Sequence, residues 1–297
     1  MSPTSLVERL IDGLDDIESL SDEFIDASTI DYDENRGLRD GYVAILCLPH
    51  GEWGPMDNHL RQIQRRLLEK WKSFWEQIEF LFSGDSTSHQ AALNEAAAAV
   101  FLWLDRSDRD HSIPATLAKA KDVFRRHASP IRELLRSHAP SNGRIFVVPD
   151  TNVVLRNQDV ATWEIAVGCS SYTVFLVPGV LGELDDHKVN HRNPEVREKA
   201  RKFSSRYKGW RQQGNLASGV RVQGDVYVQV EGREPNFKKT LSWLDSEAPD
   251  DRIIASVLEL QRRFPTTQVV LLTGDTLMLA KADTANIPTA DVPEPDL

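Results

Sequence analysis

The chain has 297 residues, of which 40% are hydrophobic and 27% are charged, and its net charge is −10. These values fit a globular protein of one large domain or two ordinary ones, and no segment approaches the roughly 20 consecutive apolar residues of a membrane span, so we expect no membrane partner. The first residues lack the basic and apolar regions of a signal peptide, and Cys47 and Cys169 lie in apolar surroundings without ligand-like spacing, so we expect a cytoplasmic protein with reduced, buried thiols.

The first half of the chain shows helical periodicity only. Apolar residues recur at the spacing of an amphipathic helix in four segments, residues 6–20, 57–82, 91–104 and 114–136. In the second segment, Trp71 and Phe74 lie on the apolar face, and we expect them to pack in a core. A run of Pro, Ser, Asn and Gly at residues 138–143 is typical of a loop. We therefore predict an all-α helical domain of unknown role over residues 1–140, which is our candidate for binding a protein partner.

Strands and helices alternate in the second half of the chain. The expected strands are residues 145–149, 173–177, 221–230 (as a hairpin) and 268–272. The expected helices are residues 160–169, a helix that begins near Pro178, and residues 193–213, 250–264 and 276–285. Strands separated by helices imply a mainly parallel sheet that helices cover on both faces, so we predict an α/β domain over residues 144–297.

Four acidic residues border the apolar segments of this half. Asp150 and Asp275 directly follow strands, whereas Glu183 and Asp251 lie in the first turns of helices. Each of them alone has an ordinary alternative role as a helix cap or as a partner of the helix dipole. Ligands of parallel sheets bind beyond the carboxyl ends of the strands, and like charges gathered there need a cation. Hard oxygen ligands favour Mg²⁺ or Mn²⁺, and the usual chemistry of these ions is phosphodiester hydrolysis.

The segments around these acids resemble the PIN-domain nucleases, the PilT N-terminus family. The matching segments are an apolar strand followed by Asp-Thr-Asn, then Val-Leu-x-Glu-Leu-Asp-x-x-Lys, Asp-Asp-x-Ile-Ile-Ala, and Leu-Thr-x-Asp followed by Lys-Ala, in the order of the family. The resemblance covers about half of the chain, and one departure is Gly274, where many relatives have Asn. It implies a three-layer PIN-like α/β/α fold and a metal-dependent phosphodiesterase, namely an endoribonuclease that cuts single-stranded RNA with Mg²⁺ or Mn²⁺.

The resemblance also implies the roles of individual residues. The implied catalytic metal ligands are Asp150, Glu183, Asp251 and Asp275. The family pattern has its ligand directly before x-Ile-Ile-Ala, which selects Asp251, so Asp250 is a candidate helix cap and a further candidate ligand. Two residues are expected to support the site. Asn152 would orient Asp150 or line the site, with an ordinary turn amide as the alternative, and Thr273 would offer its hydroxyl to the acids.

Basic residues are concentrated between residues 188 and 211, where nine Lys or Arg face only Glu195 and Glu198. Up to Gly143 the chain has 24 acidic and 16 basic residues, whereas the remainder has 21 and 19, so the second half is nearly balanced. We expect this run to contact RNA, with a solvated helix face as the alternative, and Tyr207 and Trp210 to stack on bases. The candidate RNA-binding residues are Lys188, Arg192, Arg197, Arg201 and Lys208.

Two other functions remain open at this point. A flap-type or other DNA nuclease of the same broad class would usually have more acids and a helical arch, whereas this sequence has the four acids and the basic helix. A catalytically weak PIN scaffold would bind RNA or a protein without cutting.

Overall fold

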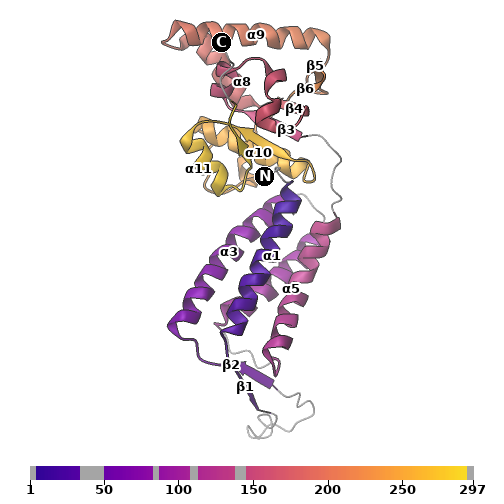
Figure 1. Ribbon diagram of the computed structural model, residues 1–297, viewed down its shortest axis with the longest axis vertical. Helices are drawn as coiled ribbons and strands as arrows, with labels where there is room; N and C mark the ends of the chain where they lie inside the picture. The colour runs from indigo at the N-terminus through magenta and orange to yellow at the C-terminus, as the bar shows by residue number, and fades with distance from the viewer. Residues whose placement is uncertain (1–4, 34–49, 83–86, 108–112, 138–144, 293–297) are drawn as a thin grey trace. The chain divides into compact units, whose positions relative to one another are not determined.

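The computed structural model describes residues 5–33, 50–82, 87–107, 113–137 and 145–292 (Figure 1). The chain divides into two compact units. One comprises Arg9–His138, and the other comprises Ala139–Leu297 together with Met1–Glu8. The loop expected at residues 138–143 and the thiol of Cys47 lie outside the described residues.

The first unit, which we call the helical unit, contains four long helices. They are α1 (Leu6–Asp26), α3 (Asn58–Phe82), α4 (Thr87–Asp105) and α5 (Leu117–Ser137). The predicted helices are confirmed, and the apolar faces of α1, α3 and α5 are buried, including Trp71 and Phe74, whereas Phe101 and Leu102 of α4 are exposed. The sequence missed a two-stranded antiparallel sheet that joins β1 (Ile30–Asp33) to β2 (His50–Trp53), so the unit is not purely helical.

Ion pairs connect two helices of this unit along their length. Lys121 and Arg125 of α5 pair with Asp26 and Asp22 of α1, at 2.7 and 2.6 Å. Further along α5, Arg132 contacts both Asp15 and Glu18 of α1, at 2.6 and 2.8 Å. The numbering falls along α1 as it rises along α5, so the two helices run antiparallel with their opposite charges facing each other.

The second unit, which we call the α/β unit, is built on a six-stranded sheet with the strand order β5-β6-β4-β3-β7-β8. The strands are β3 (Ile145–Pro149), β4 (Ser171–Leu176), β5 (Val220–Gln223), β6 (Asp225–Val230), β7 (Val269–Leu272) and β8 (Thr289–Ala290). All neighbours pair in parallel except β5 and β6, which form the expected hairpin. The predicted fold class, a helical region followed by a mainly parallel PIN-like α/β/α domain, is confirmed.

The strand register brings the carboxyl ends of the central strands to one edge of the sheet. β3 lies between β4 and β7, with Val147 beside Val174 on one side and Val270 on the other. These strands are apolar on both faces, and Val147, Val174 and Leu271 are fully buried. Such runs are typical of parallel strands that helices cover on both sides. The segments that follow β3, β4 and β7 therefore begin close together.

Helices connect these strands. They are α6 (Thr151–Arg156), η1 (Val160–Thr162), α7 (Glu164–Val167), α8 (Pro178–Asn190), α9 (Pro194–Gln213), η2 (Phe237–Lys239), α10 (Pro249–Arg263) and α11 (Thr276–Thr284). The helix expected at residues 160–169 is two short pieces, which end where Gly168 adopts a left-handed φ of 77°. Cys169 beyond it is half-buried rather than buried. None of the described helices is long and apolar enough to cross a bilayer.

Candidate functional site

Asp150 lies at the end of β3, where the chain turns into α6. Its carboxylate is 3% exposed and caps α6 by accepting a hydrogen bond from the Val153 amide at 2.6 Å. Its other oxygen accepts a hydrogen bond from the Thr273 hydroxyl at 2.5 Å. Burial raises the pKa of Asp150, the charge of Asp275 raises it further, and the two hydrogen bonds and Arg156 only partly offset these effects. The side chain is thus both a helix cap and a buried acid that would gain from a cation.

Thr273 joins Asp150 to Asp275. It is fully buried at the end of β7, and its hydroxyl accepts a hydrogen bond from the Asp275 amide at 3.0 Å while it donates to Asp150. Asp275 caps α11 through bonds from the Leu277 and Met278 amides, both 2.9 Å. The hydroxyl of Thr273 thus contacts both acids, and its supporting role in the site stays a prediction.

Glu183 reaches the same edge from α8. Thr151, the residue after Asp150, donates a short hydrogen bond to Glu183 Oε2. The start of α8 packs tightly on α10 because Gly179 has no side chain, and a Cβ there would lie 3.1 Å from Ile253 Cγ1. Thr151 was not among the residues that we predicted for the site, although it is the middle residue of the Asp-Thr-Asn motif.

Asp251 lies in the first turn of α10 and is 5% exposed. One carboxylate oxygen accepts a hydrogen bond from the Asp245 amide at 2.9 Å, and the other lies 2.6 Å from the Lys281 ammonium of α11. Asp250 lies 3.9 Å from the same ammonium. The α10 helix is capped at Ala248, with Pro249 in its first position and without a side-chain cap, so the interpretation of Asp250 as the helix cap is wrong.

The four acids are thus brought to one region of the α/β unit by β3, β7, the second turn of α8 and the first turn of α10. Within the described ranges, however, no three carboxylate, imidazole or thiol groups converge closely enough to hold a metal ion. Each carboxylate instead accepts hydrogen bonds or an ion pair from its own surroundings, as expected when like charges are brought together without a cation.

The donor set nevertheless fits a divalent cation. Asp251 Oδ1 is buried and has no hydrogen-bond partner among the described residues, so the ammonium of Lys281 neutralises it only as an ion pair. A buried carboxylate oxygen that already has a cation at 2.6 Å is chemically suited to a hard cation, and so is the buried carboxylate of Asp150, whose pKa is raised.

Two other features border Asp150 and Asp275. Asn152 is exposed on α6, and no described contact joins it to Asp150. At Gly274, a Cβ would meet the Asp291 carboxylate at 3.1 Å and the Arg156 guanidinium at 3.4 Å. Arg156 and Asp291 pair at 2.6 Å, so an ion pair lies against the residue that departs from the family pattern.

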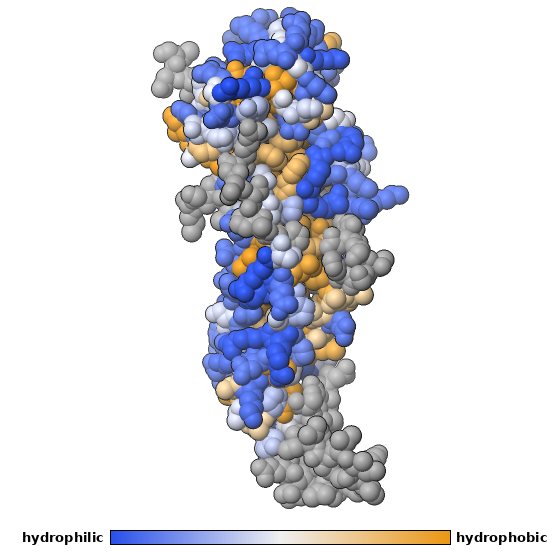
Figure 2. All heavy atoms as spheres, turned by 90° about the vertical axis from the view of Figure 1, so that its right-hand side faces the viewer, coloured by the Kyte–Doolittle hydropathy of each residue, from blue (hydrophilic) through white to orange (hydrophobic). Residues whose placement is uncertain are grey.

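The basic run forms the end of α8 and most of α9. Arg197 is not free, because its guanidinium donates to the carbonyls of His191 and Arg192 at 2.6 and 3.2 Å. Lys188 pairs with Asp185 at 2.6 Å. In the described part of the chain, no acidic group lies within ion-pair distance of the exposed side chains of Arg192, Arg201, Lys202, Lys208 and Arg211. Figure 1 shows α9 at the top of the view, and the atoms at the top of Figure 2 are mainly hydrophilic.

Two aromatic residues of α9 were expected to stack on bases, and only one of them is buried; Tyr207 is partly exposed, and its role stays a prediction. Trp210 is 6% exposed and packs edge-on against Phe203 at 5.8 Å, so its predicted role in base stacking is wrong. Helical periodicity could have predicted the burial of Trp210, because Phe203 and Trp210 are seven residues apart and share a helix face. An exposed indole lies elsewhere, at Trp243, which is 41% exposed and precedes by two residues the Asp245 amide that binds Asp251.

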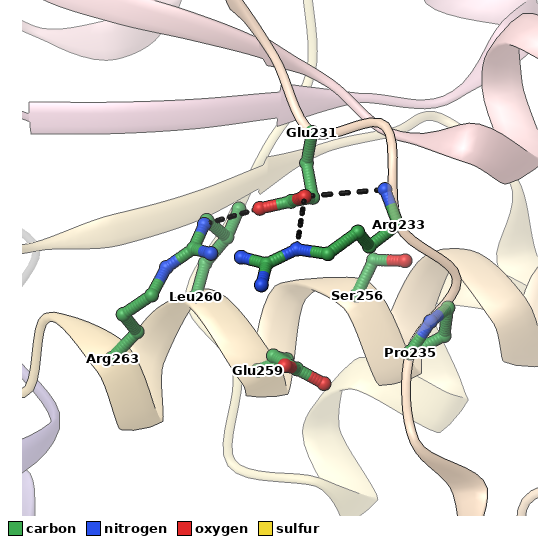
Figure 3. Close-up of a pocket in the computed structure, with 7 residues that line it drawn as sticks. All are labelled: Glu231, Arg233, Pro235, Ser256, Glu259, Leu260 and Arg263. Carbon is green, nitrogen blue, oxygen red and sulfur yellow. Dashed lines mark hydrogen bonds and ion pairs between the residues drawn. The ribbon is translucent and has the colours of Figure 1, made fainter. Parts of the chain in front are cut away.

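Another acid that follows a strand, Glu231, has a different environment. Glu231 follows β6 and accepts hydrogen bonds from Arg263 at 2.5 Å and from the side chain and amide of Arg233 at 3.3 and 3.2 Å (Figure 3). Burial acts to raise its pKa, but the two arginines hold the pKa of Glu231 below its ordinary value. The adjoining cavity of about 10 Å³ has room for about one water, so it is not a ligand pocket.

Comparison with known families identifies this unit. A family model described as a PIN domain matches residues 147–293, which confirms the resemblance found in the sequence. The search of curated proteins returned no match.

Proposed function

Residues 147–293 belong to the PIN-domain family, and from this premise we propose that the chain is an endoribonuclease that hydrolyses phosphodiester bonds in single-stranded RNA with Mg²⁺ or Mn²⁺. PIN domains are generally metal-dependent nucleases. The observation that supports the proposal most strongly is a pair of threonine contacts at one sheet edge. Thr273 connects the Asp150 carboxylate to the Asp275 backbone amide, and Thr151, directly after Asp150, binds the Glu183 carboxylate.

In this proposal, Asp150, Glu183, Asp251 and Asp275 hold the cation, and Asp250 is a further candidate. When bound, a divalent ion supplies activation of a water molecule and neutralisation of charge on the phosphate. Thr273 fixes the rotamer of Asp150, and Thr151 fixes that of Glu183, so that both oxygens are positioned before the cation arrives. Carboxylate oxygens are hard ligands, which is why Mg²⁺ or Mn²⁺ is proposed rather than a softer metal.

RNA is proposed as the substrate because Arg201 and Lys208 of α9 have no acidic partner among the described residues and because Trp243, two residues before Asp245, offers an exposed ring. A single strand presents unpaired bases that stack on aromatic side chains, at about 1–3 kcal/mol per base. Arg192, Arg201 and Lys208 would contact the phosphates. Arg197 and Lys188 would contribute less, because both already have partners.

The test compares cleavage of single-stranded RNA and single-stranded DNA by the full chain, with Mg²⁺, with Mn²⁺ and with EDTA. We expect RNA cleavage that EDTA abolishes, and a loss of at least about 100-fold in Asp150→Asn, because an amide is a poorer ligand for a hard cation than a carboxylate. The substitution conserves the shape of the side chain, and the amide oxygen can still accept the Val153 hydrogen bond, so the variant should remain folded. Cleavage at the wild-type rate by this variant would remove Asp150 from the site.

A second candidate function also has an observation in its favour. The carboxylates of the described residues do not converge into a formed metal site, which is the arrangement expected of a scaffold that binds RNA or a protein without cutting. RNA binding without cleavage in any divalent metal would favour it, and preferential cutting of DNA would favour a flap-type nuclease.

A protein partner for the helical unit is also proposed, and the exposed Phe101 and Leu102 of α4 are the residues that support it, at 46% and 58% exposure.

A further inference from the structure

The acidic region of the α/β unit contains a cation of its own. Lys281 projects from α11, six residues after Asp275, and its ammonium lies 2.6 Å from Asp251 Oδ1 and 3.9 Å from Asp250 Oδ2. Its side chain is 21% exposed, and that of Asp251 is 7% exposed. One lysine thus neutralises a buried acid that is also a proposed ligand of the divalent ion.

Lys281 supplies the counter-charge for one oxygen of Asp251. Oδ2 is bound by the Asp245 amide, whereas Oδ1 faces the Lys281 ammonium at 2.6 Å. A second cation can therefore reach Oδ1 only by replacing the ammonium. The ammonium is a compact charge at the end of a flexible four-carbon stem, so it can leave Asp251 without movement of the backbone.

The backbone on either side of this contact is held by other interactions. Asp275 caps α11 with two amide bonds, and Ala282 beside Lys281 is fully buried. The start of α10 is fixed by its packing on Gly179 of α8. The helices therefore keep Asp251 in place whether or not Lys281 contacts it.

We propose that Lys281 is an internal counter-ion of the acidic site, which the divalent cation displaces from Asp251, so that Lys281 lowers the affinity of the site for the metal. The inference rests on the proposed function, because it assigns a role to Lys281 within the same site. In the metal-free protein the ammonium stabilises the buried acid. In the metal-bound protein it is released toward solvent, where it is available to the phosphate of a substrate.

Two consequences distinguish this role from that of an ordinary ion pair. Without Lys281, a divalent ion no longer competes with an ammonium for Asp251, so metal affinity rises. The metal-free protein, in contrast, becomes less stable, because an uncompensated carboxylate remains buried. Metal should restore the lost stability, since it binds the folded site and not the unfolded chain.

The experiment measures Mn²⁺ binding to the full chain by calorimetry, after removal of metals, for the wild type, Lys281→Met and Lys281→Arg. Methionine keeps the length of the side chain and removes its charge. We expect the Kd of Lys281→Met to be at least about tenfold lower than that of the wild type, and the Kd of Lys281→Arg to be close to it or higher. The metal must overcome the attraction between a cationic side chain and a carboxylate a few ångströms apart, and this attraction readily exceeds a tenfold effect. Thermal melting without metal should show a lower Tm for Lys281→Met, and saturating Mn²⁺ should close the gap.

Lys121→Met is the matched control. Lys121 pairs with Asp26 at 2.7 Å and is 20% exposed, so it reproduces the ion pair and burial of Lys281 in the other unit of the chain. Its substitution should leave the Kd for Mn²⁺ unchanged. An equal Kd for the wild type and Lys281→Met, with both proteins binding Mn²⁺, would overturn the role of Lys281 and leave the proposed function standing. Absence of Mn²⁺ binding to either protein would overturn the proposed function and this inference together.

Discussion

Two helices of this chain are rich in basic residues, and they use them differently. In the helical unit, Lys121, Arg125 and Arg132 of α5 each face acids of α1 at 2.6–2.8 Å. In the α/β unit, Arg201 and Lys208 of α9 are exposed, and none of the described acidic residues pairs with them. The three named cations of α5 are neutralised by acids of α1, whereas Arg201 and Lys208 of α9 can contact a polyanion.

The difference shows that a basic run has no fixed meaning by itself. Whether it binds nucleic acid depends on the groups that surround it. Helix α1 supplies acids to α5, whereas Arg197 of α9 binds the backbone carbonyls of His191 and Arg192. Exposed ion pairs contribute little to stability, and cations without a partner contribute nothing. Loss of charge should therefore lower RNA affinity on α9 and lower stability slightly on α5.

The largest effect is expected on α9. The double variant Arg201→Gln/Lys208→Gln removes two cations that share a helix face and have no acidic partners among the described residues. Binding of single-stranded RNA should weaken by about tenfold or more at low salt, because each lost phosphate contact removes about 0.7 from the slope of log affinity against log salt. The Tm should hardly change. Dissociation constants at several salt concentrations, with Ca²⁺ in place of Mg²⁺ to suppress turnover, measure both quantities.

The control for that variant is on α5. Arg126→Gln/Arg136→Gln changes the net charge by the same amount at exposed positions of the helical unit. RNA affinity and its salt slope should match those of the wild type. A flatter slope in the α5 variant, with an unaltered slope in the α9 variant, would reverse the comparison and assign the RNA path to α5.

A smaller effect, on stability alone, is expected for Arg132→Met. Arg132 is 15% exposed and connects Asp15 and Glu18 of α1 to α5, so its loss leaves two acids of α1 without this partner. We expect a loss of about 1 kcal/mol, or about 4 °C in Tm for a unit of this size, with RNA affinity unchanged. Thermal melting followed by circular dichroism tests this, with Arg126→Gln/Arg136→Gln as the variant that should melt like the wild type.

The sequence predicted the elements of both units well because the periodicity of their apolar residues is regular. It also predicted Asp150 and Asp275 at the ends of strands, since a carboxylate directly after an apolar strand of a parallel sheet can lie only at that edge. Asn152, in contrast, is exposed without a described contact to Asp150, and its role stays a prediction.

Pairings between distant residues were beyond reach of the sequence. Asp251 and Lys281 are thirty residues apart, and the separation of Arg132 from Asp15 is far greater, so no local pattern predicts either contact. The burial of Trp210 was the exception, because Phe203 lies on the same helix face and the pattern was present. The β1 and β2 strands were missed for a different reason, since strands of four residues with few apolar side chains have no clear alternation.

The last prediction tests what makes an arginine stabilise the fold: an acid that faces it, or the unit of the chain in which the arginine lies. Arg263 and Arg233 lie in the α/β unit, as α9 does, but both bind Glu231 (Figure 3). Because the arginines lower the pKa of Glu231 despite its burial, ionised Glu231 stabilises the fold above the ordinary glutamate pKa, and this contribution is lost as the pH falls through the lowered value. Glu231→Gln should therefore melt about 3 °C below the wild type at pH 7, for a loss of about 1 kcal/mol, and the gap should shrink as the pH falls below about 4.5.

Glu234→Gln is the matched control for this last prediction, because Glu234 also binds an arginine of α10, Arg252, at 2.5 Å but is 55% exposed. Solvent screens that pair, so its loss should lower the Tm by less than that of Glu231 at pH 7. Equal shifts in the two variants, or a gap for Glu231→Gln that persists unchanged at low pH, would mean that the arginines of the pocket stabilise the fold by packing and not through the charge of Glu231. In that case the arginines of α9 that have no described acidic partner would differ from Arg233 and Arg263 only in burial. The difference between paired and unpaired cations would then not be one of charge.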